Sequence, residues 1–432
     1  MKIIRYPAKE TWDDILRRST LDTQFLERTV ANILSDVRAN GDAALRHCGR
    51  HFDKVELDEF LVTEDEFLDA ELLVSEPIKS AIAFAKSNIE KFHSLPSEQP
   101  EIIETTAGVF CWKKSVPIEK VGLYVPAGSA PLFSTVLMLV IPAKIAGCRE
   151  VIVCSPPNSA GKIDPITLYA AKLCGATRVY KIGGAQAIAA LAYGTETVTP
   201  VFKIFGPGNQ FVTEAKLQVL RSGVAIDMPA GPSEVAVLVD ETSVPAFVAA
   251  DLLSQAEHGP DSQVVLVSTS ETVINETLAE IDRQIELLPR KTIAASAVQN
   301  STAILVNTID EGVEILNNYA PEHLIIATDA AETVAEKIVN AGSVFIGNYS
   351  CESAGDYASG TNHTLPTGGA ARAYSGVSVA SFTKSITFQR LTAEGIRNLG
   401  PTIEAMAAAE GLDAHRAAVA IRREWIGGRD DV

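Results

Sequence analysis

From residue 121 onward, short apolar runs alternate with longer amphipathic stretches, and this alternation constrains the fold more than any other feature of the sequence. Short apolar runs bounded by turn residues are typical of buried strands, and the stretches between them have helical spacing. Strands are predicted at 122–126, 150–154, 178–182, 203–205 and 224–227. Helices are predicted at 134–147, 165–173, 186–193 and 209–220. Repeated strand–helix–strand units of this kind build a parallel sheet.

A second run of the same type follows a Pro- and Gly-rich segment at 228–232, which we interpret as a hinge. Its predicted strands are 264–268, 303–307, 323–327 and 343–346, and its predicted helices are 272–287, 310–318 and 331–341. Residues before 121 are predicted to be largely helical, as is the tail from Leu391. The sequence therefore predicts an α/β protein with two parallel sheets.

Charge and composition exclude several classes of partner. The chain has 37 Lys and Arg against 54 Asp and Glu, a net charge of −17, which repels nucleic acids and anionic membranes. The most apolar stretch, 130–143, is shorter than the roughly 20 residues of a spanning helix and contains two prolines. The N-terminus lacks an apolar signal region, and the six cysteines form no C-x-x-C pair. We expect a cytoplasmic protein that binds neither nucleic acid nor membranes.

Two glycine-rich turns each follow a predicted strand and open a predicted helix: Gly206-Pro207-Gly208-Asn209 and Gly183-Gly184-Ala185-Gln186. Such turns let a phosphate approach the backbone and the free N–H groups of a helix N-terminus. The same residues also make ordinary tight turns, and no G-x-G-x-x-G fingerprint is present. On spacing alone, both interpretations stay open.

Four histidines occupy non-periodic contexts: His258, His323, His363 and His415. Gln255 lies three residues before His258, so the two share one face of a helical turn. Imidazole, carboxylate and amide groups can together hold Zn²⁺, but no H-x-x-x-H spacing announces a metal site. Solvated or core histidines are the alternative.

Glu322 and His323 are adjacent at the start of an apolar strand, directly after Pro321. A Glu and a His can divide proton transfers between them, since their pKa values can be tuned toward neutrality. Their position argues the other way, because ligands of open α/β sheets usually bind at the carboxyl ends of strands. A solvated strand end is the alternative. The long polar stretch 349–375 that follows is predicted to be a functional or disordered loop.

Seven strings, in this order and spacing, together resemble the histidinol dehydrogenase family: VGLYVPAGSAPLFSTVLM, GGAQAIAALAYGTE, KIFGPGNQFVTEAK, IDMPAGPSEV, ADLLSQAEHGPDSQV, YAPEHLI and SAGDYASGTNHTLPT. The resemblance implies two incomplete Rossmann-like domains with small helical N- and C-terminal tail domains. The implied parts are a tail at 1–24, a first α/β domain at 25–120 plus 232–375 with the zinc and catalytic residues, a second at 121–231 with the NAD contacts, and a tail at 376–432 that contacts the partner subunit.

The family oxidises L-histidinol to L-histidine through histidinaldehyde with two NAD⁺, in the last steps of histidine biosynthesis. Its members are homodimers with a shared active site and one Zn²⁺ per subunit. Carried over by motif, the implied zinc ligands are Gln255, His258, Asp356 and His415, and the implied catalytic pair is Glu322 and His323. The implied substrate contacts are these four ligands with Ser233, His323, His363 and Glu410, and the implied NAD contacts are Tyr124, Gln186 and Asn209.

Three alternatives remain beside this expectation. A related NAD-dependent dehydrogenase could act on another small alcohol, although the histidines that match the imidazole-binding positions argue against it. A zinc-dependent hydrolase could use the Glu-His pair on water with no redox step. A non-catalytic metal-binding or scaffold protein could have kept the fold.

Overall fold

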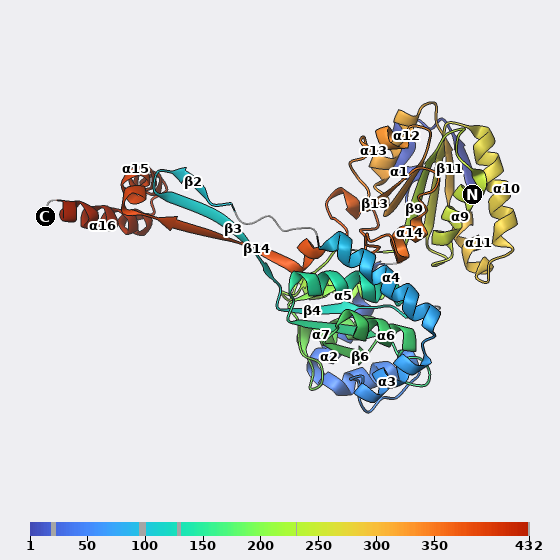
Figure 1. The fold of residues 1–432 in the computed structure, drawn as a ribbon, viewed down its shortest axis with the longest axis horizontal. Helices are drawn as coiled ribbons and strands as arrows, with labels where there is room; N and C mark the ends of the chain where they lie inside the picture. The colour runs from blue at the N-terminus through green and yellow to red at the C-terminus, as the bar shows by residue number, and fades with distance from the viewer. Residues whose placement is uncertain (19–22, 95–100, 128–130, 230, 431–432) are drawn as a thin grey trace. The chain divides into compact units, whose positions relative to one another are not determined.

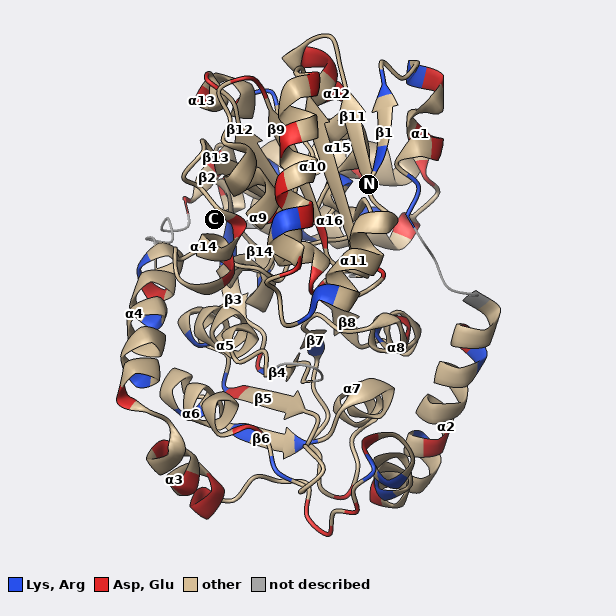
Figure 2. Ribbon diagram, turned by 90° about the vertical axis from the view of Figure 1, so that its right-hand side faces the viewer, with Lys and Arg blue, Asp and Glu red and all other residues tan. Residues whose placement is uncertain are grey.

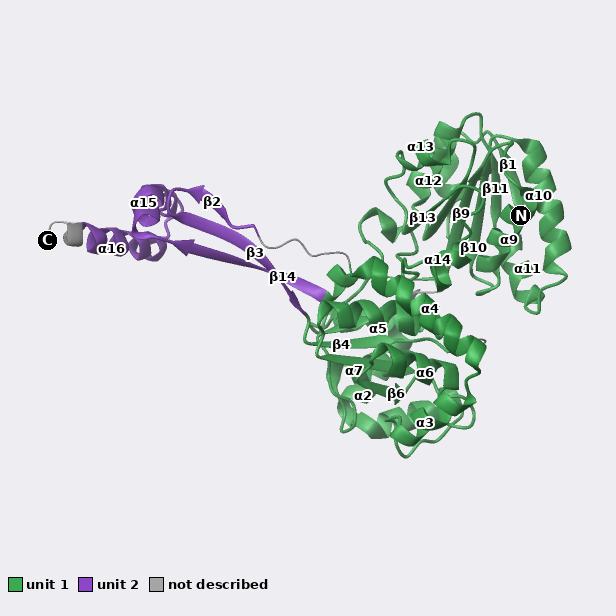
Figure 3. Cartoon of the chain, viewed as in Figure 1, with its two compact units in different colours: residues 1–94, 118–382 green, residues 95–117, 383–432 purple. Residues whose placement is uncertain are grey.

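The computed structural model describes residues 1–18, 23–94, 101–127, 131–229 and 231–430 (Figure 1), and it divides into two compact units. Unit 1 comprises residues 1–94 and 118–382, and unit 2 comprises residues 95–117 and 383–432 (Figure 3). None of the helices in these described ranges is long and apolar enough to span a membrane.

Unit 1 contains two parallel sheets. The five-stranded sheet has the spatial order β6 (Arg178–Lys181), β5 (Glu150–Ser155), β4 (Lys120–Tyr124), β7 (Lys203–Phe205) and β8 (Ala225–Ile226). The chain therefore winds outward from β4 through β5 to β6 and returns beside β4 with β7. The loops after β4 and β7 leave in opposite directions, so this sheet has a topological switch point between those two strands.

Helices cover both faces of the five-stranded sheet (Figure 2). Val121 and Leu123 of β4 face a core formed with α4 (Glu76–His93), α5 (Ser134–Ala146) and α6 (Pro165–Cys174). Tyr124 and Ile152 face the opposite core, with α2 (Thr23–Cys48), α7 (Gly184–Tyr193) and α8 (Gln210–Leu220). Helix α3 (Glu64–Leu73) packs beside α6. A sheet buried on both faces explains why its strands are largely apolar between their charged end residues.

The six-stranded sheet has the order β1 (Lys2–Arg5), β11 (Thr302–Leu305), β10 (Gln263–Ser268), β9 (Glu234–Val239), β12 (His323–Ala327) and β13 (Ser343–Ile346). One face packs on α9 (Pro245–Ala256), α10 (Glu271–Ile285) and α11 (Lys291–Gln299). The other face packs on α1 (Trp12–Ile15), α12 (Ile309–Tyr319) and α13 (Ala331–Ala335). Strand β9 lies centrally, with His323 of β12 in register with Val235.

Unit 2 combines a three-stranded antiparallel sheet with two helices. The sheet has the order β14 (Thr383–Leu391), β3 (Val109–Pro117) and β2 (Ile103–Thr106), and the helices are α15 (Ala393–Ala409) and α16 (Asp413–Asp430). In the long β14–β3 pair, Trp112 stacks on Phe388 with ring centroids 5.5 Å apart.

The predicted α/β class with two parallel sheets is confirmed, and β7, β12 and β13 have the predicted bounds. Four strands lie in segments that were predicted to be helical or given no structure: β1, β2, β3 and β14. Strand β9 was also absent from the prediction, although its sequence EVAVLV is entirely buried. The predicted helix at 331–341 ends at Ala335. Residue 230, within the predicted hinge, lies outside the described residues.

The expected grouping of residues 25–120 with 232–375 differs from the packing. Helices α2, α3 and α4 pack on elements of the five-stranded sheet, and β2 and β3 belong to unit 2. Helical periodicity shows that a helix has a buried face, but it does not show which sheet covers that face. The residue limits expected for the two α/β domains and the two tails stay a prediction.

A buried ion pair fastens the loop that follows β7. Lys216 of α8 pairs with Asp227, and their side chains are 2% and 1% exposed. Lys216 Nζ donates to the Gly206 carbonyl at 3.0 Å, and the Gly206 amide donates to Asp227 at 2.7 Å. Gly206 has a φ of +123°, and a Cβ there would collide with the Tyr124 carbonyl. Lys216 and Asp227 thus bind the carbonyl and the amide of Gly206, a position where only glycine fits.

We predict that Lys216→Met lowers the free energy of unfolding by about 3–5 kcal/mol, because it leaves the Asp227 carboxylate buried without its partner. Urea unfolding followed by circular dichroism measures the change. Lys9→Met is the control: it breaks the exposed Lys9–Glu314 pair and should cost less than about 1 kcal/mol. Equal losses in the two variants would contradict the role of the buried pair.

Candidate functional site

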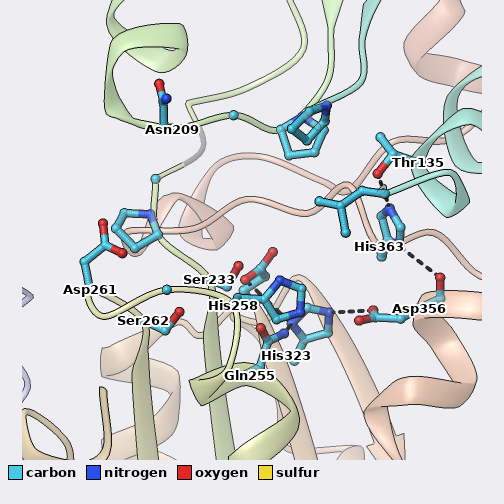
Figure 4. A pocket seen from close by; sticks show the side chains of 18 of the residues that line it. Thr135, Asn209, Ser233, Gln255, His258, Asp261, Ser262, His323, Asp356 and His363 are labelled. Atoms are coloured by element: carbon cyan, nitrogen blue, oxygen red, sulfur yellow. Dashed lines mark hydrogen bonds and ion pairs between the residues drawn. The ribbon is translucent and has the colours of Figure 1, made fainter. Parts of the chain in front are cut away.

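A pocket in unit 1 lies between the two sheets and has a cavity volume of about 280 Å³ (Figure 4). The carboxyl ends of β4 and β7 form one wall, and the amino ends of β9, β10 and β12 form the other. Its polar lining residues are Ser134, Thr135, Asn209, Gln210, Ser233, Gln255, His258, Asp261, Ser262, Glu322, His323, Asp356, Tyr357 and His363.

The wall from the five-stranded sheet contains the glycine-rich turn after β7. Pro207, Gly208 and Asn209 all line the pocket. The Asn209 side-chain oxygen caps α8 by accepting the amide N–H groups of Phe211 and Val212, both at 3.1 Å. This turn lies at the switch point of the sheet, where ligands of open α/β sheets bind.

Two of the three predicted NAD contacts are not among the residues that line this pocket. Tyr124 is buried at the end of β4, and its hydroxyl accepts the Gly184 amide at 3.1 Å. Gln186, also buried, lies 3.5 Å from the Asp53 carboxylate, and burial raises the pKa of Asp53 to about 6. Both lie near the carboxyl ends of strands of the same sheet as Asn209.

Glu322 and His323 line the opposite wall at the amino end of β12, and both are buried. The Glu322 carboxylate accepts the backbone N–H of Glu234 at 2.8 Å. His323 Nδ1 lies 3.2 Å from the Glu234 carbonyl and 3.0 Å from Gln255 Nε2. His323 Nε2 lies 3.3 Å from Asp356 Oδ1. Both members of the predicted pair are thus held by the peptide groups of one residue, Glu234.

The surroundings shift the pKa values of this pair upward. Burial raises the pKa of the Glu322 carboxyl to about 8, although His323 and the Glu234 amide oppose that shift. Burial alone would lower the pKa of His323, but the carboxylates of Glu322, Glu352 and Asp356 raise it to about 10. Groups with such perturbed pKa values in a cleft are candidates for proton transfer.

Three predicted zinc ligands, Gln255, His258 and Asp356, point toward one another in the pocket (Figure 4). Gln255 Oε1 is buried and has no hydrogen-bond partner within the described chain, and Asp356 Oδ1 pairs with His323 Nε2 at 3.3 Å. Burial would raise the pKa of Asp356, but the nearby histidines lower it below its usual value, which keeps the carboxylate anionic. An orphaned buried amide oxygen, a carboxylate and an imidazole together are a donor set that suits Zn²⁺.

The predicted substrate contacts Ser233 and His363 also line the pocket. His363 Nδ1 donates to the Asp356 carbonyl at 2.9 Å, so Nε2 is the nitrogen that accepts the Thr135 hydroxyl at 3.1 Å. Burial lowers the pKa of His363, which favours this neutral tautomer. The stretch 349–375 was predicted to be a functional or disordered loop. It contains a short helix, α14 (Glu352–Tyr357), and it supplies Asp356 and His363 to the pocket.

Glu352 is a site residue that the sequence analysis missed. It is 1% exposed, its Oε2 has no hydrogen-bond partner in the described structure, and burial raises its pKa well above the usual value. Ligand atoms of Glu352, His323 and Asp356 all lie within 4.8 Å of one another, an arrangement that can hold a cation. Glu352 precedes Asp356 by four residues on α14, and this helical spacing was the signal available in the sequence.

The two remaining predicted residues lie in unit 2. Glu410 ends α15, and His415 lies in the first turn of α16, where its amide donates to the Leu412 carbonyl at 3.1 Å. The pocket in unit 1 therefore brings together eight of the twelve predicted site residues: Asn209, Ser233, Gln255, His258, Glu322, His323, Asp356 and His363.

Comparisons with known proteins agree over nearly the whole chain. The family model for histidinol dehydrogenase matches residues 16–423. A histidinol dehydrogenase of Bacteroides thetaiotaomicron is 57% identical over 98% of this chain and 99% of its own, and one of Vibrio parahaemolyticus is 52% identical over 96% of each. The crystal structure of histidinol dehydrogenase from Elizabethkingia anophelis, 52% identical, superposes with a TM-score of 0.96 over 99% of both chains.

The resemblance found in the seven sequence strings is thereby confirmed, and it extends to the fold of the entire chain. On the strength of the family match, the relatives and the shared structure, this chain belongs to the histidinol dehydrogenase family.

Proposed function

We propose that this protein is a zinc-dependent, NAD-linked dehydrogenase that oxidises L-histidinol to L-histidine through histidinaldehyde, in the last steps of histidine biosynthesis in the cytoplasm. The observation that carries the proposal is the pocket. It combines the glycine-rich turn after β7, at the switch point of the five-stranded sheet, with the buried pair Glu322 and His323. Family membership supplies the choice of substrate.

Oxidation of an alcohol to a carboxylate removes four electrons, so two hydrides leave the same carbon. Two NAD⁺ accept them as co-substrates, one water enters between the two steps, and three protons are released. The chain therefore has to accept a proton from the alcohol and then activate a water molecule.

We assign the first proton transfer to His323 and the second to Glu322. His323 Nδ1 is occupied by the Glu234 carbonyl and Gln255 Nε2, so Nε2 is the nitrogen that can take the hydroxyl proton when the ring is neutral. Binding of Asp356 to zinc would offset one of the carboxylates that raise the His323 pKa, which favours the neutral ring that this step requires. Glu322 has one carboxylate oxygen fixed by the Glu234 amide, so the other oxygen remains for a water. Because the pocket is enclosed by two sheets, it would also protect the reactive aldehyde from side reactions.

Gln255, His258 and Asp356 would hold the zinc in unit 1, and His415 would complete the set. Zinc in this position supplies orientation of the substrate's nitrogen donors. Asp356 is the single anion among these four residues, so the site keeps a positive charge that suits neutral nitrogen donors. The imidazole and amino groups of histidinol are such donors.

The first test is the stoichiometry of the reaction. Limiting L-histidinol should yield two NADH per molecule, and the yield should vanish with a zinc chelator and return with added Zn²⁺. Absorbance at the NADH band measures it, with EDTA-treated and reloaded enzyme compared in parallel. One NADH per histidinol would contradict the four-electron assignment, and no NADH from folded, zinc-loaded protein would favour a different alcohol as substrate.

A second prediction separates the roles of the pair and gives a pH dependence. Glu322→Gln should slow oxidation of supplied histidinaldehyde by about 10²–10⁴-fold, since it removes a general base. In the parent enzyme this rate should rise as the pH increases through about 8, because the raised pKa of Glu322 keeps the base protonated below that pH.

Stopped-flow formation of NADH from pH 6.5 to 9 measures both effects. Glu332→Gln, which changes an exposed carboxylate on α13, is the matched control and should follow the parent profile. A Glu322→Gln rate as fast as that of the parent would rule out Glu322 as the water-activating base.

We further propose a homodimer in which unit 2 carries Glu410 and His415 to the active site of the partner subunit. Large apolar side chains are exposed on this unit, namely Ile386, Met406, Leu412, Ile421 and Trp425. Exposed apolar groups in such number are typical of a surface that another chain covers.

Mixed dimers test the shared site. His415→Asn and Glu322→Gln should each be inactive alone, because each removes one required group. Purified mixed dimers, obtained with two different affinity tags, should recover about half of the parental activity, since one of the two isologous sites then has both groups intact. Mixed dimers without activity would place both groups in the site of one chain.

A further inference from the structure

We propose that Arg18 is a positioning residue for the pair Glu322 and His323, and that it acts through Glu234. The inference rests on the proposed function, because it concerns the same proton transfers. Neither Arg18 nor Glu234 is among the residues that line the pocket, so their effect has to pass through the groups that they hold.

The peptide groups of Glu234 contact both members of the pair. Its N–H donates to Glu322 at 2.8 Å, and its carbonyl lies 3.2 Å from His323 Nδ1. The first contact fixes the orientation of the carboxylate, and the second fixes the place of the ring in the pocket wall. A rotation or shift of this peptide would misplace both groups at once.

The side chain of Glu234 holds that peptide in place. It is 4% exposed and forms a two-point pair with Arg18, whose Nε and Nη2 lie 2.5 and 2.9 Å from its two oxygens. The amide of Gly368 donates to the same carboxylate at 3.0 Å. Two parallel N–H···O bonds fix the direction of the carboxylate as well as its position.

Arg18 in turn is fixed to the end of α12. Its Nη2 donates to the Tyr319 carbonyl at 2.9 Å, and its guanidinium lies 4.0 Å from the centre of the Tyr319 ring. Tyr319 precedes the catalytic pair by only a few residues, so the guanidinium connects the starts of β9 and β12. Arginine can do this because its planar fork serves several acceptors at once.

Loss of Arg18 would leave the Glu234 carboxylate buried with the Gly368 amide as its one remaining partner among the described residues. A buried carboxylate without its counter-charge rearranges toward water or another donor. The start of β9 would move with it, and an error of about 1 Å at reacting groups costs on the order of 10²-fold in rate. Binding of substrate through Gln255, His258 and Asp356 does not depend on this contact.

The test compares Arg18→Ala with Arg17→Ala in the zinc-loaded, full-length enzyme. Arg17 is the adjacent arginine, 75% exposed and paired with Asp14, so it controls for loss of a positive charge at this place in the chain. Arg18→Ala should lower kcat by about 10- to 100-fold with KM changed less than threefold, and it should slow oxidation of histidinol and of supplied histidinaldehyde alike. Arg17→Ala should match the parent.

Chemical rescue distinguishes positioning from a general loss of structure. Millimolar guanidinium chloride, too dilute to denature, should raise the kcat of Arg18→Ala at least fivefold by occupying the place of the missing side chain, and it should leave Arg17→Ala unchanged. If Arg18→Ala does not fold, Arg18→Lys, which keeps the charge but lacks the two-point geometry, should show a kcat about tenfold low at unchanged KM.

The outcomes are distinct. A kcat equal to that of the parent in Arg18→Ala overturns the inference. If Arg18→Ala does not fold, a parental kcat in Arg18→Lys overturns it. A folded Arg18→Ala whose kcat guanidinium does not raise also overturns it. If the parent enzyme and Arg17→Ala do not oxidise histidinol, the proposed function fails and the inference fails with it. If they do oxidise it and Arg18→Ala is equally fast, the inference alone fails.

Discussion

The pairing of β9 with β12 is the constraint on which the site depends. It puts the peptide of Glu234 beside Glu322 and His323, so that a backbone amide and a backbone carbonyl hold the two groups proposed to move protons. Both strands are central in a sheet whose two faces are covered by helices. The hydrophobic burial that stabilises the sheet therefore also fixes the orientation of the catalytic pair.

The two sheets contribute opposite edges to one pocket. The five-stranded sheet presents the carboxyl ends of its strands, which is where nucleotides bind in open α/β folds. The six-stranded sheet presents amino ends, so position alone argued against Glu322 and His323 as functional residues. The rule that ligands bind at the carboxyl ends of strands describes a single sheet. Here the amino ends of the six-stranded sheet form the wall of the pocket opposite the five-stranded sheet.

Much of the fold could be predicted from the sequence, because buried parallel strands are apolar and bounded by turns. Strand β9 has this pattern and could have been predicted, whereas β3 and β14 are largely exposed and mix polar with apolar residues. The motifs predicted Gln255, His258, Glu322, His323 and Asp356, which do meet in one pocket. Glu234 and Arg18 could not be found in this way, because their contacts join segments far apart in the chain.

The use of a peptide to hold the pair also has a consequence for sequence variation. Every residue except proline offers the same N–H and C=O, so a substitution at position 234 keeps the two groups that contact Glu322 and His323 but changes how firmly they are held in place. Substitutions at position 234 would change the contacts that hold this peptide, but they would not remove its N–H and C=O groups. The rate at such a site can therefore evolve through residues that never meet the substrate, while the groups that touch it stay the same.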